Sequence, residues 1–320
     1  MAAIACTLLQ LCRRGDHIVA SRTVYGGTHA LLTELLPQWG IAVTLVDPTR
    51  TEAFEAASRP ETRAWYTETV GNPTLVVADI PTLARSARSR EITFVVDNTF
   101  TPMMVSPAVL GADIVIYSLT KFVNGASDLV AGAICARRAF IRQLMDLHTG
   151  RAMLLGPTLD PRAAFDVIQR IPHLAIRMRE HSRRAMAMAE QLAAWGVAVS
   201  YPGLSSFPQH ALLRRLVNEG YGFGGMLTID CGTQRKAETL MDILQNRERF
   251  GFMAVSLGYF DSLMSCSGAS TSSEIDEAEQ RAMGLSPGLL RLSVGITGNL
   301  EERIKQLGRA LQECGLAAAG

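Results

Sequence analysis

The stretch TFVVDNTFTPMMVSPAVLGADIVIYSLTKFVNGASDLVAGAIC, residues 93–135, decides the fold class of this chain. It contains three short apolar runs, at residues 93–100, 113–118 and 129–135. Strands that are covered on both faces of a parallel sheet read as such near-continuous runs of valine and isoleucine. The three runs therefore predict buried strands of a mostly parallel α/β sheet.

The residues upstream of this stretch continue the same alternation. Apolar runs at 17–21, 43–47 and 63–69 read as strands, and the segments 28–40 and 80–90 read as helices. Ligands of such sheets usually sit at the carboxyl ends of the strands. We therefore look for functional residues in the loops that follow the strands.

After Pro172 the pattern changes to that of a second, smaller α+β domain. The predicted division is a large domain of residues 1–172 and a small domain of residues 173–320. The elements predicted for the small domain are a long amphipathic helix at 174–196, strands at 224–231, 252–258 and 289–295, and helices at 238–246 and 300–315.

Composition excludes several classes of function. The chain has 320 residues, 48% of them hydrophobic, and a net charge of +1, which gives no strong field for nucleic acid or an anionic membrane. No apolar stretch reaches the roughly 20 residues that cross a bilayer. Neither the six cysteines nor the histidines have metal-ligand spacing, so we expect no metal and reduced thiols in a cytoplasm. The expected partner is a small molecule.

Two charged residues at strand ends form the candidate reaction centre. Asp97 ends the apolar run of residues 93–97, where an unpaired charge would cost several kcal/mol, so it needs a cationic partner such as a protonated pyridine nitrogen. Lys121 follows the strand at 113–118. Taken alone, Lys121 reads much more readily as a solvated surface lysine, and Asp97 reads equally as a helix cap or turn residue.

Residues near these two could complete a cofactor site. The loop Tyr25-Gly26-Gly27-Thr28 could lay an aromatic ring over a planar cofactor, although it also reads as an ordinary turn. Ser118 and Thr120 offer hydroxyls suited to a phosphate, although they also read as strand-end caps.

These residues lie in motifs that resemble those of the Cys/Met-metabolism family of pyridoxal phosphate (PLP) enzymes. The likeness covers nearly the whole chain and is most specific in VYGGTHALL (24–32), TETVGNPTLVVADIP (67–81), residues 95–132, YPGLSSFPQH (201–210) and GLLRLSVG (288–295). The resemblance implies the fold type I architecture of PLP-dependent transferases, similar to aspartate aminotransferase. It also implies pyridoxal 5′-phosphate as cofactor, and a homodimer or homotetramer.

The resemblance also implies roles for individual residues. Lys121 would hold the cofactor as a Schiff base and then move protons, and Asp97 would pair with the ring nitrogen. The remaining assignments are Tyr25 for ring stacking and catalysis, Asn72 for the ring hydroxyl, Ser118, Thr120 and Met1 for the phosphate, and Arg291 with Ser256 for the substrate.

Three stretches are more similar to plant-type methionine γ-lyases than to bacterial cystathionine enzymes: residues 153–158, 170–182 and 250–274. This likeness favours elimination of methionine to methanethiol, 2-oxobutanoate and ammonia. Gly27 stands where many bacterial methionine γ-lyases carry cysteine, and plant-type members resemble this chain in having glycine. Cystathionine γ-lyase, cystathionine γ-synthase and O-acetylhomoserine sulfhydrylase, enzymes of transsulfuration, stay open as alternatives.

Family members usually begin some tens of residues earlier, with an arm that reaches the phosphate of a neighbouring subunit. The resemblance therefore predicts a chain without this arm, with Met1 at the phosphate-binding turn. A catalytically poor protein that retains the fold is the alternative from another class. A nicotinamide dehydrogenase is disfavoured because no G-x-G-x-x-G follows the first strand.

Overall fold

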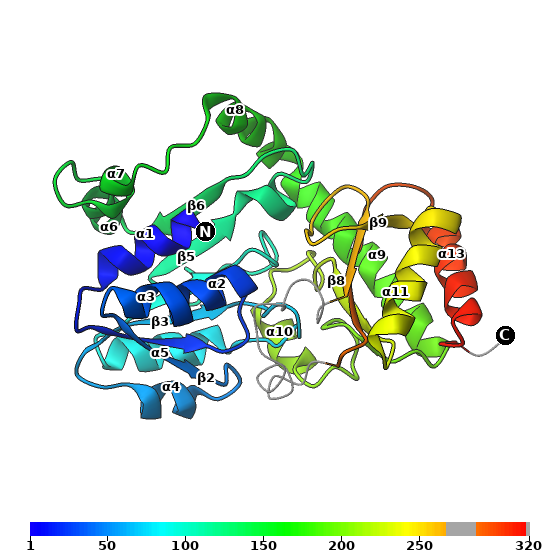
Figure 1. The fold of residues 1–320 in the computed structure, drawn as a ribbon, viewed down its shortest axis with the longest axis horizontal. Helices are drawn as coiled ribbons and strands as arrows, with labels where there is room; N and C mark the ends of the chain where they lie inside the picture. Colours follow the sequence, from blue (N-terminus) through cyan, green and yellow to red (C-terminus); the bar gives the residue numbers. More distant parts are fainter. Residues whose placement is uncertain (267–285, 318–320) are drawn as a thin grey trace. The chain divides into compact units, whose positions relative to one another are not determined.

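The structure, a computed structural model, describes residues 1–266 and 286–317 (Figure 1). Residues 267–274 of the methionine γ-lyase-like stretch lie outside the described residues. The chain forms two compact units. The first unit is Met1–Asn72, Val76–Thr120 and Leu129–Gln169, and the second unit is Pro73–Leu75, Lys121–Asp128 and Arg170–Gly320. The predicted domains, residues 1–172 and 173–320, stay a prediction.

The first unit is built on a six-stranded sheet in the order β2-β1-β3-β4-β5-β6. Strands β1 to β5 pair in parallel, and β6 pairs antiparallel with β5. The bounds are β1 His17–Ser21, β2 Ala42–Val46, β3 Thr62–Glu68, β4 Thr93–Asp97, β5 Ile114–Ser118 and β6 Gly132–Ala136. The mostly parallel sheet that the apolar runs predict is present.

Helices cover both faces of this sheet, which explains the continuous apolar runs. Figure 1 shows α1, α2 and α3 on one side of the sheet and α4 and α5 on the other. On the first side, helix α1 packs through Ile4 and Leu8 into the same buried cluster as Ile18 and Tyr66 of the strands. The bounds are α1 Ala2–Leu11, α2 Gly26–Ala30, the turn η1 Leu31–Leu35, α3 Leu36–Gln38, α4 Thr51–Ala57, α5 Ile80–Ser89, α6 Arg138–Leu144, α7 Arg151–Leu155 and α8 Pro161–Arg170.

The second unit contains a five-stranded sheet in the order β7-β8-β11-β10-β9. Its strands are β7 Val199–Ser200, β8 Met226–Asp230, β9 Gly251–Met253, β10 Ser262–Cys266 and β11 Leu289–Ser293. Alternation along β11 buries Leu290 and Leu292 in the helix-covered core, so Arg291 lies on the opposite face of the sheet. The predicted strand at 252–258 was wrong in extent, because only its first two residues belong to β9 and the rest forms a loop.

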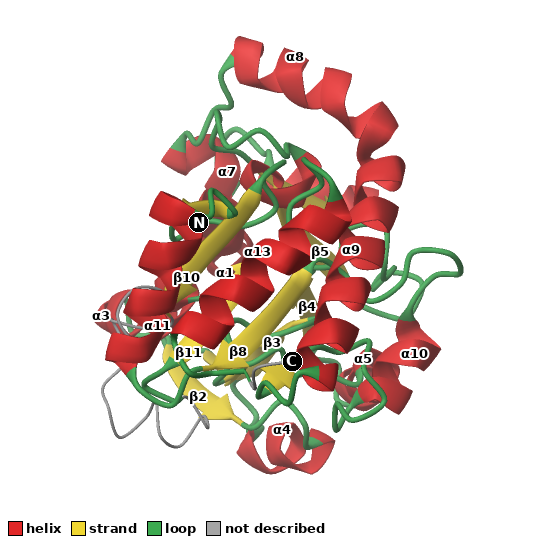
Figure 2. Cartoon of the chain, turned by 90° about the vertical axis from the view of Figure 1, so that its right-hand side faces the viewer, coloured by secondary structure: helices red, strands yellow, loops and turns green. Residues whose placement is uncertain are grey.

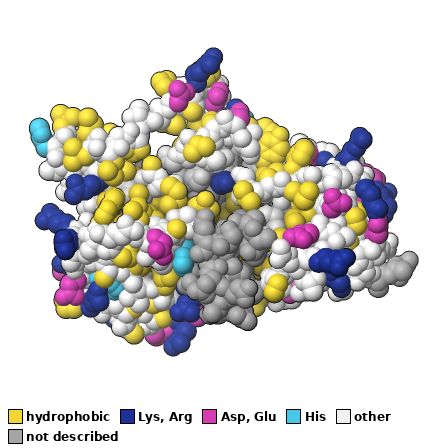
Figure 3. All heavy atoms as spheres, viewed as in Figure 1, with side chains coloured by type: hydrophobic (Ala, Val, Ile, Leu, Met, Phe, Trp, Pro, Cys, Tyr) yellow, Lys and Arg dark blue, Asp and Glu magenta, His cyan; other side chains and the backbone are white. Residues whose placement is uncertain are grey.

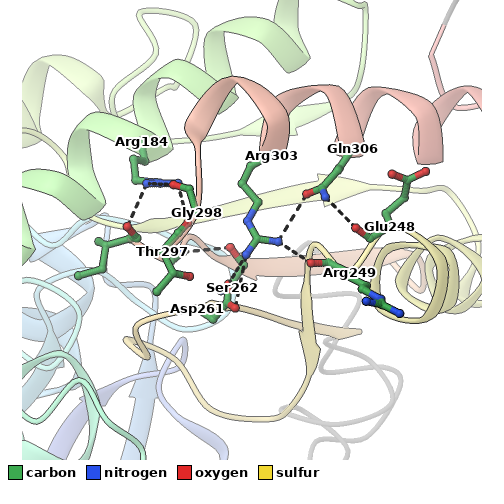
Figure 4. A network of polar contacts seen from close by, with 11 residues as sticks. Arg184, Glu248, Arg249, Asp261, Ser262, Thr297, Gly298, Arg303 and Gln306 are labelled. Carbon is green, nitrogen blue, oxygen red and sulfur yellow. Dashed lines mark hydrogen bonds and ion pairs between the residues drawn. The ribbon is translucent and has the colours of Figure 1, made fainter.

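Helices α9, α11 and α13 pack on the core face of the second sheet (Figure 2). The helical bounds are the turn η2 Leu119–Val123, which crosses between the two units, the turn η3 Ile171–His173, α9 Leu174–Ala194, α10 His210–Leu216, α11 Gln234–Asp242, the turn η4 Ile243–Arg247 and α13 Leu300–Glu313. Arg303 anchors α13 by donating to Asp261 Oδ1, 3.1 Å away, and to the carbonyl of Arg249 (Figure 4). Among the described helices, none is long and apolar enough to cross a membrane.

Candidate active site

The carboxyl ends of three neighbouring strands place polar side chains at one edge of the first sheet. Glu68 ends β3, Asp97 ends β4 and Ser118 ends β5. Glu68 and Asp97 are direct partners in the parallel register of β3 and β4, so their side chains lie on the same face of the sheet. The edge thus carries a pair of carboxyl groups.

Asp97 is a buried carboxylate with only neutral hydrogen-bond donors. Its side chain is 8% exposed and accepts from the backbone N–H of Thr99 at 2.9 Å and from the Tyr66 hydroxyl at 3.4 Å. Burial raises the pKa of Asp97. Within the described residues Asp97 forms no ion pair, so its surroundings suit the cationic partner that the sequence predicts.

Glu68 joins two loops at the same edge. Its Oε1 accepts from the backbone N–H of Tyr25 at 2.7 Å, and its Oε2 accepts from the backbone N–H of Asn72 at 2.9 Å. The side chain is 7% exposed, and burial, followed by the charge of Asp97, raises the pKa of Glu68. Sequence reasoning missed this residue.

The loop after β1 holds Tyr25 and approaches the start of the chain. Tyr25 precedes the first residue of α2 and is 47% exposed, so much of its ring is open to a ligand. A Cβ built on Gly27 would lie 2.7 Å from the Tyr25 ring and 3.3 Å from Met1 Sδ. The structure therefore brings Met1, Tyr25 and Gly27 together, and any larger side chain at Gly27 would displace the ring.

Ser118 and Thr120, the predicted phosphate residues, differ in their contacts. The backbone N–H of Ser118 donates to Thr99 Oγ1 at 2.9 Å. The Thr120 hydroxyl donates to the carbonyl of Ala131 at 3.2 Å and accepts from the backbone N–H of the same residue at 2.9 Å. Thr120 thus already ties its segment to the chain that leads into β6.

The second unit brings together Lys121, Ser256 and Arg291. Lys121 Nζ donates to Ser256 Oγ at 2.9 Å, and Arg291 Nη2 donates to the Ser256 carbonyl at 3.1 Å. Burial lowers the pKa of Lys121 to about 8, and the charge of Arg291 adds to this effect. Lys121 can therefore exchange a proton near neutral pH.

Arg177 of α9, which sequence reasoning also missed, holds the backbone that follows Lys121. Its guanidinium donates to the carbonyl of Phe122 at 2.5 Å and to the carbonyl of Val123 at 2.7 Å. The Lys121 backbone itself is non-helical, with φ −91° and ψ −130°. Arg177 is 5% exposed, and burial lowers its pKa to about 10.

Glu68 carried a signal that could have revealed it, because it is a charged residue at the end of an apolar strand, as Asp97 is. The same argument from buried charge applies to both. Arg177 carried no such signal, because an arginine on an amphipathic helix is ordinary.

A solved structure has the same architecture. The chain superposes on the crystal structure of cystathionine gamma-lyase from Lactobacillus plantarum complexed with L-serine with a TM-score of 0.88. The two are 28% identical, over 98% of this chain and 80% of the other. The predicted fold class is confirmed, and a buried aspartate together with a low-pKa lysine is what an enzyme of the PLP-dependent class needs.

The chain belongs to the Cys/Met metabolism PLP-dependent enzyme family, which its residues 1–312 match. It is 52% identical to the methionine gamma-lyase of Arabidopsis thaliana over 97% of this chain and 71% of that protein. It is 34% identical to the cystathionine gamma-lyase of Bacillus subtilis over 98% of this chain and 80% of that protein. The predicted family and the predicted cofactor, pyridoxal 5′-phosphate, are confirmed.

The described residues fit this cofactor. A half-buried primary amine with a lowered pKa, at Lys121, suits attachment of an aldehyde, and the buried carboxylate of Asp97 suits a protonated ring nitrogen. Within residues 1–266 and 286–317, no cluster of three or more histidine, cysteine, aspartate or glutamate side chains could hold a metal ion.

Proposed function

We propose that this enzyme eliminates the γ-substituent of L-methionine, consuming water and releasing methanethiol, 2-oxobutanoate and ammonia. The observation that carries the proposal is the 52% identity to the plant methionine gamma-lyase over nearly the whole chain. Likeness to methionine gamma-lyases of Fusobacterium nucleatum and Porphyromonas gingivalis, at 35% and 36% identity, supports it.

In this proposal the first unit binds the cofactor without reacting with it. Asp97 would hold the proton on the ring nitrogen, Tyr25 would stack on the cofactor ring, and Asn72 would bind the ring hydroxyl. Ser118, Thr120 and the amino end of α1 at Met1 would bind the phosphate. When bound, the cofactor withdraws electrons from the substrate, so that the bonds at its α-carbon can be broken.

The residues of the second unit would bind substrate and move protons. Arg291 binds the substrate carboxylate, because a guanidinium offers two parallel donors to a carboxylate. Lys121 accepts the proton from the α-carbon of the substrate and later donates it to another atom. Its pKa of about 8 lets it act as both base and acid near neutrality. Ser256 orients the Lys121 amine by its hydrogen bond. Tyr25 acts with Lys121 as a catalytic side chain.

Elimination of cystathionine is the second candidate. The structural likeness to cystathionine gamma-lyase and the 34% identity to the Bacillus subtilis enzyme favour it. Replacement reactions that form cystathionine, or that add sulfide to O-acetylhomoserine, use the same early proton transfers.

Apolar side chains on the surface of the first unit support assembly into a homodimer or homotetramer. They lie around α6, α7 and α8, and some are visible as yellow side chains at the upper left of Figure 3. Exposed apolar patches on a monomer mark interaction surfaces. The members are Met145, Leu147, Met153, Leu154, Leu155, Phe165 and Ile168. We place the enzyme in the cytoplasm, where its six free thiols would stay reduced.

The test is a side-by-side assay of 2-oxobutanoate release from L-methionine, L-cystathionine and O-acetyl-L-homoserine by the purified chain with PLP. We expect methionine to give the highest kcat/KM and equal amounts of methanethiol and keto acid. Lys121→Ala should abolish turnover and the cofactor absorption band of the protein. Keto acid from cystathionine alone would exclude our assignment, and a band without any product would indicate the catalytically poor alternative.

A further inference from the structure

Glu68 is a buried acid without a role in the proposed reaction, and it connects two loops of the first unit. It ends β3 beside Asp97, and each of its two oxygens accepts a backbone N–H from a different loop. One loop, after β1, carries Tyr25. The other, directly after β3, carries Asn72. These are the two residues that our proposed function places around the cofactor ring.

Resting on that proposed function, we propose that Glu68 is a positioning residue that fixes Tyr25 and Asn72 around the cofactor ring without touching the cofactor itself. It acts through the backbone of both residues. The loops carrying them are thereby tied to the same strand end, next to the aspartate that binds the ring nitrogen.

At position 68, glutamate can accept a hydrogen bond from each of the two loops, whereas glutamine and aspartate cannot. The two contacts are 2.7 Å and 2.9 Å, so both oxygens act as acceptors at full hydrogen-bond strength. A glutamine would present an amide N–H₂ group to one of the two N–H donors, and that loop would lose its acceptor. An aspartate is one methylene shorter, and it would reach one loop at the expense of the other.

The neighbouring charge favours the same conclusion. Because Glu68 and Asp97 are both buried on one face of the sheet, each opposes ionisation of the other. A protonated ring nitrogen at Asp97 offsets this repulsion, and ionised Glu68 then accepts more strongly from both N–H groups. Cofactor binding and loop positioning would therefore reinforce each other.

The experiment compares wild type with Glu68→Gln and Glu68→Asp in the 320-residue chain. Three readouts are used: hydrogen exchange at the Tyr25 and Asn72 amides without cofactor, the Kd for PLP, and the visible circular dichroism of the bound cofactor. We expect faster exchange at these amides, PLP binding weakened about tenfold or more, and an altered dichroism band, because one of the two loops loses its hydrogen-bond acceptor. Glu68→Asp should lie between wild type and Glu68→Gln.

Two controls separate positioning from stability. Leu83→Ala removes a buried side chain of α5 in the same unit, and Glu61→Gln removes an exposed charge at the other end of β3. Both should leave the PLP Kd and the dichroism unchanged, even though Leu83→Ala lowers the melting temperature. If both Glu68 variants keep the wild-type PLP Kd and dichroism, the inference about Glu68 is wrong and the proposed function is unaffected. Failure of the wild-type chain to bind PLP would overturn the proposed function and the inference with it.

Discussion

Lys121 shows how the surroundings of one lysine can lower the pKa of its amine. Among the described residues its Nζ donates to the hydroxyl of Ser256, and burial together with the charge of Arg291 opposes protonation. Within the part of the chain that the structure describes, no carboxylate stabilises its charged form. The environment thus raises the fraction of neutral amine near neutral pH, and this is the form that can attack an aldehyde or accept a proton.

This environment predicts a specific pH dependence of stability. The pKa of Lys121 is about 8 in the folded protein and 10.5 as the ordinary value, so the unfolded chain binds more protons between these limits. Stability should therefore rise with pH from about 8 to 10.5 in the cofactor-free wild type relative to Lys121→Met, by roughly 3 kcal/mol. Urea unfolding of both proteins at several pH values measures it. Parallel curves for the two proteins would show that the lysine is not desolvated.

Helix α9 is the element that organises the second unit. One face of it carries Arg177, His181 and Arg184 at spacings of four and three residues, so all three point the same way. His181 Nδ1 lies 2.7 Å from the carbonyl of Val294, and Arg184 donates to the carbonyls of residues 296–298 (Figure 4). Together with the contacts of Arg177, this face of α9 supplies hydrogen-bond donors to the backbone carbonyls of two segments, residues 122–123 and residues 294–298.

Replacing Arg177 should therefore cost far more than replacing an arginine elsewhere on the same helix. Arg177→Met leaves two buried carbonyls without donors, and we expect a loss of about 2–4 kcal/mol in the free energy of unfolding. Arg183→Met removes only an exposed pair with Glu180 and should cost less than about 0.5 kcal/mol. Urea denaturation provides the comparison. Equal losses in the two variants would contradict the role given to this face.

The elements also show what the sequence could and could not predict. Strands β3, β4 and β5 lie within two or three residues of their predicted ends, because buried parallel strands carry a local apolar signal. Strand β10 was missed, because SLMSC alternates too briefly to stand out and acquires its structure from β9 and β11. Lys121 and Asp97 could be singled out by local context, whereas Arg177 contacts residues 54 and 55 positions away and leaves no local trace.

At the scale of the whole molecule, the exposed apolar side chains call for a partner surface. Phe165 and Ile168 are 61% and 62% exposed and lie three residues apart on α8, so they share one face of the helix. Val167 between them is buried. An isolated chain would gain nothing from presenting this face to water.

We therefore expect the double variant Phe165→Ser, Ile168→Ser to shift the protein toward smaller assemblies. Light scattering coupled to size-exclusion chromatography gives the mass directly. Arg162→Ser, on the same helix, is the matched control for surface composition and should keep the wild-type mass. A wild-type chain that is already a monomer at micromolar concentration would refute the proposed oligomer.

The chain enters the second unit for Pro73–Leu75 and again for Lys121–Asp128, and it leaves the first unit for the last time at Arg170. During translation, Lys121 is therefore synthesised long before the residues that will surround it in the folded protein. Arg177, which holds the adjoining backbone, is synthesised 55 residues after Phe122, and Ser256 follows Lys121 by 135 residues. Until then the lysine amine keeps the ordinary basicity of a solvated side chain. The cofactor can meet its finished attachment point only once most of the polypeptide has been translated, which makes acquisition of the cofactor one of the last steps of biosynthesis.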